Sequence, residues 1–183
     1  MKTSKIFLLG GSGKLGQQLI KTLKDRNIDY FAPTHKECDI IYMNQIRKHI
    51  ERNKPEIIIH SAGFVDTPKA EVHKKLCVDT NVLGTYNIVE LCREYGIRLI
   101  FISSEYVFSG EEDVYKPNSP INGKSIYGLT KGCGELMTRT LDDYIIIRAP
   151  FIRAEVFPHP KAFVNQYTSR KYIHEITDEI IDF

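Results

Sequence analysis

A glycine-rich turn near the start of the sequence constrains the fold more than any other feature. Residues 5–9 form a mainly apolar run, glycines follow at three-residue intervals, and apolar residues then recur at helical spacing. This order predicts a strand, a tight turn and a helix. Such a turn directs free backbone N–H groups and the positive end of the helix at a pyrophosphate. The candidate cofactor-binding residues of the turn are Gly10, Gly13, Lys14, Leu15 and Gly16. The alternative is a purely structural turn.

The rest of the sequence alternates between expected strands and helices. Apolar strands are expected at 29–32, 54–63, 98–104 and 144–150, and helices at 42–52, 69–95 and 127–140, the second broken near residues 79–81 and ended by Gly96. This alternation predicts an α/β protein with a doubly wound parallel sheet, the Rossmann fold, over residues 1–150. Residues 151–183 form a short C-terminal extension, in which 171–183 could add a strand and a short helix that close the sheet.

Composition excludes several classes of partner. The 183 residues suit about one domain, and 25 basic against 23 acidic residues give a formal charge of only +2. We therefore expect no nucleic-acid or membrane partner, and no apolar run reaches the length of a membrane helix. Four scattered cysteines without a C-x-x-C pair, and an opening strand in place of a signal peptide, favour a cytoplasmic protein. No His, Cys or acidic residues stand at metal-ligand spacing, so no metal site is expected.

Several residues follow expected strands at the edge where a parallel sheet collects its ligands. Ser61, Ala62 and Gly63 end the strand at 54–63 and are candidate cofactor contacts. In the loop after the second strand, Lys36 offers a cation where an acidic residue would favour NAD, so NADP(H) is the preferred cofactor and NAD(H) remains possible. Lys36 could equally be a solvated loop lysine. Asn81 is either a tolerated polar residue or one that faces the cofactor.

Tyr127 and Lys131 carry the candidate chemistry. Four residues apart on a helix, they share one face, and a nearby ammonium would favour the phenolate of a tyrosine. By itself this pair could be a surface accident. Its place after a glycine-rich turn and after a strand that ends in Ser103 and Ser104 favours a common site at the sheet edge. The polar loop at 110–125 has the length of a segment that covers an active site, or it is a surface excursion.

Five ordered motifs resemble the extended short-chain dehydrogenase/reductases, and within them the dTDP-4-dehydrorhamnose reductases and their sugar-nucleotide-binding relatives. The motifs are the glycine turn at 10–16, the strand at 54–63, Asn81-Val-Leu-Gly-Thr85, the segment 102–110 and Tyr127-Gly-Leu-Thr-Lys131 with Gly134-Glu135. The resemblance implies that Ser104 belongs to a catalytic triad, that Tyr127 is the general acid, and that Lys131 lowers its pKa and holds the nicotinamide ribose. It also places Asp39 and Ile40 at the adenine, and Glu105 and Phe64 at the substrate.

The implied function is an NAD(P)H-dependent reduction of a keto-sugar nucleotide or of a similar small carbonyl compound. The resemblance also implies a homodimer. A dehydratase would carry Asp-Glu where this chain has Glu105-Tyr106, so the dehydratase and epimerase readings rank lower. The alternative is a non-catalytic nucleotide-binding regulatory or accessory subunit. Residues 151–183 would be a remnant of the family's substrate domain, which is short or absent here. Gly132 in the expected catalytic helix matches nothing in the family pattern.

Overall fold

The structure is a computed structural model that describes residues 5–152 and 171–182. Five parallel strands form the central sheet in the order β2-β1-β3-β4-β5. Their bounds are Ile6–Leu9 (β1), Tyr30–Phe31 (β2), Ile57–His60 (β3), Arg98–Ile102 (β4) and Tyr144–Ile147 (β5). The strand order reverses between β1 and β3, and a crevice for a ligand forms at such a switch point beyond the carboxyl ends of the strands. The predicted α/β doubly wound fold is therefore confirmed.

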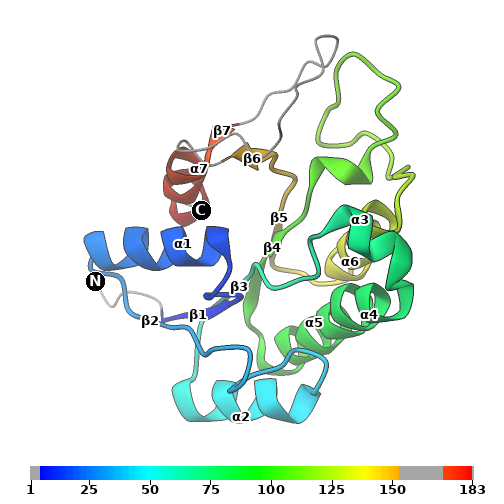
Figure 1. Ribbon diagram of the computed structural model, residues 1–183. Helices are drawn as coiled ribbons and strands as arrows, with labels where there is room; N and C mark the ends of the chain where they lie inside the picture. The colour runs from blue at the N-terminus through cyan, green and yellow to red at the C-terminus, as the bar shows by residue number, and fades with distance from the viewer. Residues whose placement is uncertain (1–4, 153–170, 183) are drawn as a thin grey trace.

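Helices cover both faces of the sheet (Figure 1). Their bounds are Lys14–Asp25 (α1), Met43–Asn53 (α2), Thr67–Val72 (α3), Lys74–Val78 (α4), Gly84–Tyr95 (α5), Ile126–Thr138 (α6) and Ile173–Ile181 (α7). Two short segments complete the set, the π-helical turn η1 at Asp79–Leu83 and the 3-10 turn η2 at Glu105–Val107.

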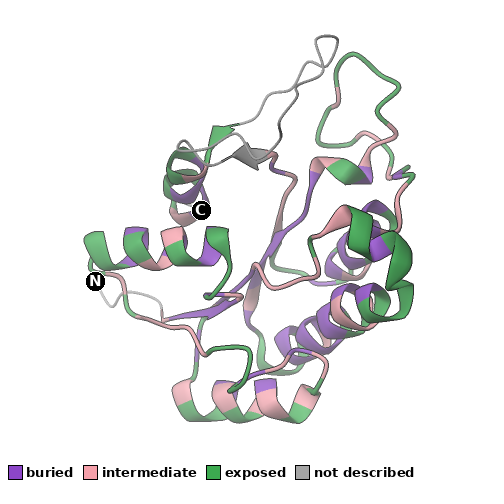
Figure 2. Ribbon diagram, in the orientation of Figure 1, coloured by how far each residue is buried: buried purple, intermediate pink, exposed green. Residues whose placement is uncertain are grey.

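Alternation of side chains along the strands produces two cores. In β1, Phe7 and Leu9 point to the face covered by α2 and α5, whereas Ile6 and Leu8 point to the face covered by α1 and α7. Figure 2 shows the buried residues on the strands and on the helix sides that face them. Both faces of the sheet are covered, which explains why its strands read as continuous apolar runs.

Two sequence-based expectations are wrong in detail. The helical stretch expected at 69–95, with a break near residues 79–81, consists of three helices and a π-helical turn. The expected break is the π-helical turn η1, whereas the end of α3 at His73 was not expected. The C-terminal strand does not close the central sheet. It is β7 (Lys171–Tyr172), which pairs in parallel with β6 (Phe151–Ile152) in a separate two-stranded sheet, while α7 packs on α1. Residues 153–170 of the expected C-terminal extension lie outside the described residues.

Candidate functional site

The turn between β1 and α1 is shaped by contacts that only glycine allows. Gly10 has a φ of +89°, and a Cβ atom there would lie 2.5 Å from the backbone nitrogen of Ala62. A Cβ atom at Gly16 would lie 2.1 Å from the carbonyl oxygen of Gly10. The Gly13 amide donates to the same carbonyl at 3.0 Å and closes the turn. The glycines therefore bring α1 against the end of β1 and bring that turn against the end of β3.

The first turn of α1 presents backbone donors at the carboxyl edge of the sheet. Its N-cap is Gly13, which has no side chain to satisfy them, and the first amide bonded within the helix is that of Gln17, to the Gly13 carbonyl at 2.9 Å. The amides of Lys14, Leu15 and Gly16 precede that bond. This cradle, which a side chain at the glycines would fill, fits the pyrophosphate of a dinucleotide.

The end of β3 lies beside this cradle. The Ser61 hydroxyl donates to the Leu9 carbonyl at 2.8 Å, and Ala62 contacts Gly10 as described above. A Cβ atom at Gly63 would lie 3.0 Å from the side-chain oxygen of Asn81. The structure thus brings Ser61 and Ala62 to the end of β1 and its glycine turn, and Gly63 to Asn81.

Asn81 uses its side chain to hold the loop after β3. Its Oδ1 accepts the Phe64 amide at 2.7 Å, and its Nδ2 donates to the Phe64 carbonyl and to the Thr130 hydroxyl, both at 3.0 Å. Asn81 is 3% exposed, and its amide group is engaged with protein groups. Its position is therefore next to the site, but its contacts are with the loop and α6.

Ser104 and Tyr127 meet where β4 and α6 converge. The Ser104 hydroxyl donates to the Glu105 carboxylate at 3.0 Å and lies close enough to Tyr127, which is buried at the start of α6, to lower the pKa of its phenol. Ser125 caps that helix by accepting the Gly128 amide at 3.0 Å. Phe64 packs against the small apolar cluster that contains Tyr127. The residues assigned to the substrate side thus lie beside the expected catalytic pair.

The pKa of Tyr127 differs from the sequence-based expectation. Burial raises it to about 12, and the charge of Glu105 adds to this, whereas the hydrogen bond with Ser104 lowers it. Lys131 lies one turn further along α6, but its Nζ donates to the Ile102 carbonyl at 2.7 Å and lies 4.1 Å from the Phe101 ring centre. In this geometry burial, and not Lys131, dominates the pKa of the phenol.

Lys131 is itself strongly affected by burial, which lowers its pKa to about 7. The carboxylate of Glu135, one turn further along α6, opposes this change. At neutral pH the lysine is therefore close to half protonated, and the phenol of Tyr127 is fully protonated. The site holds a proton on Tyr127 and has a titratable cation one helical turn away.

The predicted adenosine side is more open. Lys36 and His35 are exposed in the loop after β2, with the His35 ring 3.7 Å from the Asp39 carboxylate. Asp39 also accepts the Ile41 amide at 3.1 Å. The Ile40 side chain is buried, and a Cβ atom at Gly84 would lie 2.6 Å from it. Ile40 is therefore a core residue through its side chain, whereas Lys36 is free to reach a ligand.

Two features of the site could not be predicted or explained from the sequence. Ser103, Glu135 and Arg148 form a buried network beneath Ser104, and only the four-residue spacing of Tyr127, Lys131 and Glu135 could have signalled it. Gly132 is explained, since a Cβ atom there would lie 2.4 Å from a methyl group of Ile121. Helix α6 therefore needs a glycine at position 132 so that Ile121, in the loop before it, can pack against the helix.

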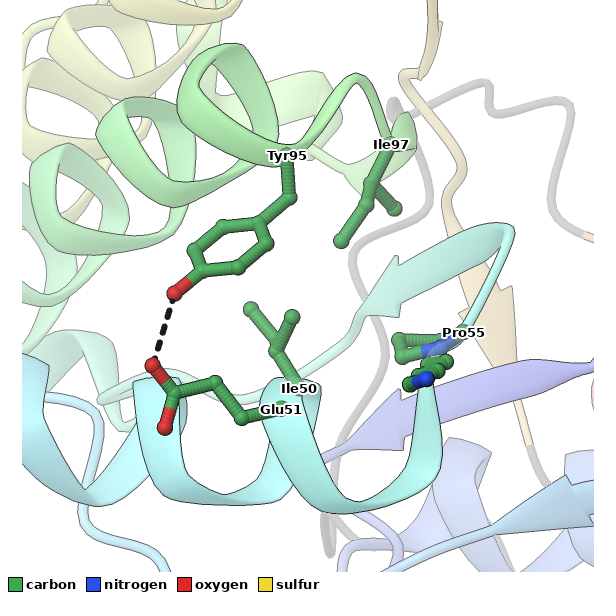
Figure 3. Close-up of a pocket in the computed structure, with 6 residues that line it drawn as sticks. Ile50, Glu51, Pro55, Tyr95 and Ile97 are labelled. Atoms are coloured by element: carbon green, nitrogen blue, oxygen red, sulfur yellow. Dashed lines mark hydrogen bonds between the residues drawn. The ribbon is translucent and has the colours of Figure 1, made fainter.

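A pocket of about 360 Å³ lies away from this edge, near the ends of α2 and α5 (Figure 3). Ile50, Pro55 and Ile97 line it, and the Tyr95 hydroxyl donates to Glu51 at 3.0 Å across its mouth. None of the predicted site residues lines this pocket. Within the described residues no group of three or more His, Cys, Asp or Glu side chains could hold a metal ion, and no helix there could span a membrane.

The sheet is parallel, has this strand order and carries a glycine-rich βα turn at its switch point. Ser104, Tyr127 and Lys131 lie at the same edge. Together these features define a Rossmann-fold protein. The chain belongs to the family described as RmlD substrate binding domain, whose model matches residues 4–178. This confirms the family resemblance drawn from the sequence motifs.

The comparisons with individual proteins agree on the fold. The chain is 26% identical over 183 residues to a dTDP-4-keto-6-deoxy-D-glucose reductase of Streptomyces niveus, covering 98% of this chain and 62% of that protein. It is 27% identical over 161 residues to methionine adenosyltransferase 2 subunit beta of Danio rerio, covering 83% and 49%. The crystal structure of dTDP-4-dehydrorhamnose reductase from Bacillus anthracis in complex with NADP matches with a TM-score of 0.87, 24% identity, and 98% and 70% coverage. The chain thus spans about half to three-fifths of the length of these two curated relatives.

Proposed function

We propose that this protein takes part in the NAD(P)H-dependent reduction of a keto-sugar nucleotide. The observation that carries the proposal is the meeting of Ser104 and Tyr127 at the sheet edge that also holds the glycine cradle. A purely structural βα turn would not need a buried phenol and a buried lysine beside it. The reductases among the similar proteins support the substrate class.

In the proposed reaction Tyr127 gives its proton to the carbonyl oxygen of the substrate as that oxygen gains negative charge. The raised pKa keeps the phenol protonated at neutral pH, which a general acid requires. Ser104 turns its hydroxyl from Glu105 to the same oxygen and stabilises the developing charge. The dinucleotide supplies the hydride that goes to the carbonyl carbon. The product is an alcohol, and the phenolate regains its proton from water.

The cofactor would lie along the cradle described above. The first-turn amides of α1 would bind the pyrophosphate, Ser61 to Gly63 would line its path, and Lys131 would hold the nicotinamide ribose. The exposed Lys36 favours NADP(H) over NAD(H), because a cation can pair with the 2′-phosphate. Calorimetric titration with NADPH and with NADH tests this preference, and tighter binding of NADH would overturn it.

The substitution Tyr127→Phe tests the catalytic role. It removes the proton donor and keeps the ring, so we expect kcat with a dTDP-linked 4-keto-6-deoxy sugar to fall about 10²–10⁴-fold. The measurement is the loss of NADPH absorbance under saturating substrate. Tyr144→Phe is the matched control, since Tyr144 is exposed at the opposite, amino end of β5, and it should retain the parent rate. Equal rates for Tyr127→Phe and the parent would refute the assignment.

A second candidate is a regulatory or accessory subunit that binds the dinucleotide without turnover. The similarity to a protein named as the beta subunit of methionine adenosyltransferase 2 favours it. The same assay separates the two candidates. Binding of NADPH without consumption on any keto-sugar nucleotide would support the accessory role and exclude the reductase.

A further inference from the structure

Glu135 is a carboxylate with no exposed surface, on the same helix as Tyr127 and two turns further along. It accepts the Ser103 hydroxyl at 2.6 Å and a fork of two Arg148 donors, Nε at 2.8 Å and Nη2 at 2.7 Å. Arg139 reaches it more loosely, at 3.5 Å, from a side chain that is 43% exposed. A charge buried this deeply persists only when paired, so Arg148 is the partner that the position requires.

The other end of the Arg148 guanidinium holds a different part of the chain. Its Nη1 donates to the carbonyl oxygens of Pro117 and Ser119, at 3.4 and 3.2 Å, and its carbon lies 4.8 Å from the Phe108 ring centre. One side chain thus joins α6, the end of β5 and the loop between β4 and α6. Lysine could not do this, because it lacks the planar set of donors.

The same loop, residues 105–125, runs along the Tyr127 end of α6, beyond the carboxyl end of β4 (Figure 1). Ile121 sits on Gly132, as described above. The Tyr106 carbonyl oxygen would lie only 2.1 Å from a Cβ atom at Gly128, and the Tyr106 ring meets Tyr127 edge-on, with centres 5.6 Å apart. The loop therefore forms a wall next to the proposed general acid.

We propose that Glu135 and Arg148 are a pair of positioning residues that hold the 105–125 loop as the substrate-side wall of the site. Apart from Glu135, the contacts of Arg148 are with the loop, so its loss affects the binding of the sugar nucleotide and not that of the dinucleotide. Its effect on substrate rests on the proposed function. The role of the pair in fixing the loop does not rest on the proposed function, and it can be measured without substrate.

Hydrogen exchange of the 110–124 segment tests the holding of the loop directly. Arg148→Lys keeps the charge that Glu135 needs but loses the donors to Pro117 and Ser119, so exchange in this segment should rise about tenfold. Arg139→Lys is the matched control, since Arg139 also faces Glu135 but does not touch the loop, and it should exchange like the parent. Unchanged exchange in Arg148→Lys would contradict the proposal, and a variant with no donor at residue 148 repeats the test.

The double variant Glu135→Gln with Arg148→Met serves for this repeat, because it removes both buried charges together and leaves no donor for the loop. We expect it to fold and to exchange rapidly at 110–124. A folded double variant with parental exchange would refute the proposal outright.

A second arm measures the effect on substrate. In both variants KM for the keto-sugar nucleotide should rise at least about tenfold. In Arg148→Lys, which keeps the Glu135 charge near Lys131, the dissociation constant of NADPH should stay at the parental value. A loss of NADPH affinity equal to the rise in KM would show a general structural role and would contradict the proposal. If the parent shows no turnover, the proposed reductase fails while the exchange arm still tests the loop.

Discussion

At the residue scale, burial lowers the pKa of Lys131, whereas the charge of Glu135 raises it. The net change in this pKa can be measured through the pH dependence of the unfolding free energy. This pKa is about 7 in the folded protein, whereas an unfolded chain exposes the ammonium with a pKa of about 10.4. Between these values the unfolded chain binds a proton that the folded chain does not, so the unfolding free energy rises with pH. Below pH 7 both states carry the proton, and the gain is lost.

Two buried thiols limit the window in which Lys131 can be observed. Burial raises the pKa of Cys38 to about 11 and that of Cys92 to about 12. From a pH of about 8 upwards the unfolded thiols lose protons that the folded ones keep, which lowers stability. The lysine is therefore best followed from about pH 7 to 9 as a difference between the parent and a variant that lacks it, because the two share the effect of the thiols.

In that window the parent should gain about 1–3 kcal/mol of unfolding free energy relative to Lys131→Met, at about 1.4 kcal/mol per pH unit of full effect. Lys131→Met removes the titrating lysine and should show only the fall in stability that the thiols cause. Urea unfolding at pH 7, 8 and 9 measures this. Lys116→Met, at an exposed loop position, should keep the parental slope. A parental slope in Lys131→Met would show that another group titrates.

At the scale of elements, the local sequence was sufficient to predict structure wherever a residue shapes the fold through its own backbone conformation. The glycine spacing predicted the turn from β1 to α1, and Gly96 ends α5 with a φ of +64°, as a C-cap glycine does. The break at Asn81 was placed roughly, but its π-helical form depends on hydrogen bonds to Phe64 and Thr130, which lie far away in sequence. Propensity alone cannot encode such contacts.

The same distinction separates the site residues that could be predicted from those that could not. Residues at the ends of strands could be placed together, because parallel strands end at one edge, and the structure does bring Ser104 beside Tyr127. The Glu135–Arg148 pair and the effect of burial on Tyr127 could not be predicted. Both depend on how deeply a side chain lies once distant segments have packed, and no short sequence pattern reports that depth.

The turn itself offers a sharp test of the element. Gly16→Ala places a Cβ atom 2.1 Å from the Gly10 carbonyl oxygen, so the protein should lose about 1–3 kcal/mol of unfolding free energy or more. Gly13→Ala is the matched control, with an ordinary φ of −73° and a nearest contact of 3.3 Å, and should stay within about 1 kcal/mol of the parent. Urea unfolding measures both. Equal losses would contradict the close approach of α1 to β1.

At the scale of the whole molecule, α7, at the end of the described chain, packs against α1 near its beginning. Ile176 and Ile180 pack into the core on the α1 face of the sheet, and the Thr177 hydroxyl lies 3.1 Å from that of Thr22 on α1. Arg26 adds an exposed ion pair to Asp178 at 2.9 Å. Whether residues 151–183 are also the remnant of a larger substrate domain stays a prediction. The packing shows only that α7 shares a core with β1.

If that shared core governs stability, burial and not the ion pair should hold α7 in place. Ile180→Ala empties a position that is 1% exposed and should cost about 2–5 kcal/mol. Asp178→Ala removes only an exposed charge from the same helix and should cost under about 1 kcal/mol. Urea unfolding followed by circular dichroism compares the two, and a single transition is expected for both. A loss in Ile180→Ala no larger than that in Asp178→Ala would mean that α7 frays independently, since a helix that detaches before the sheet melts contributes nothing to global unfolding.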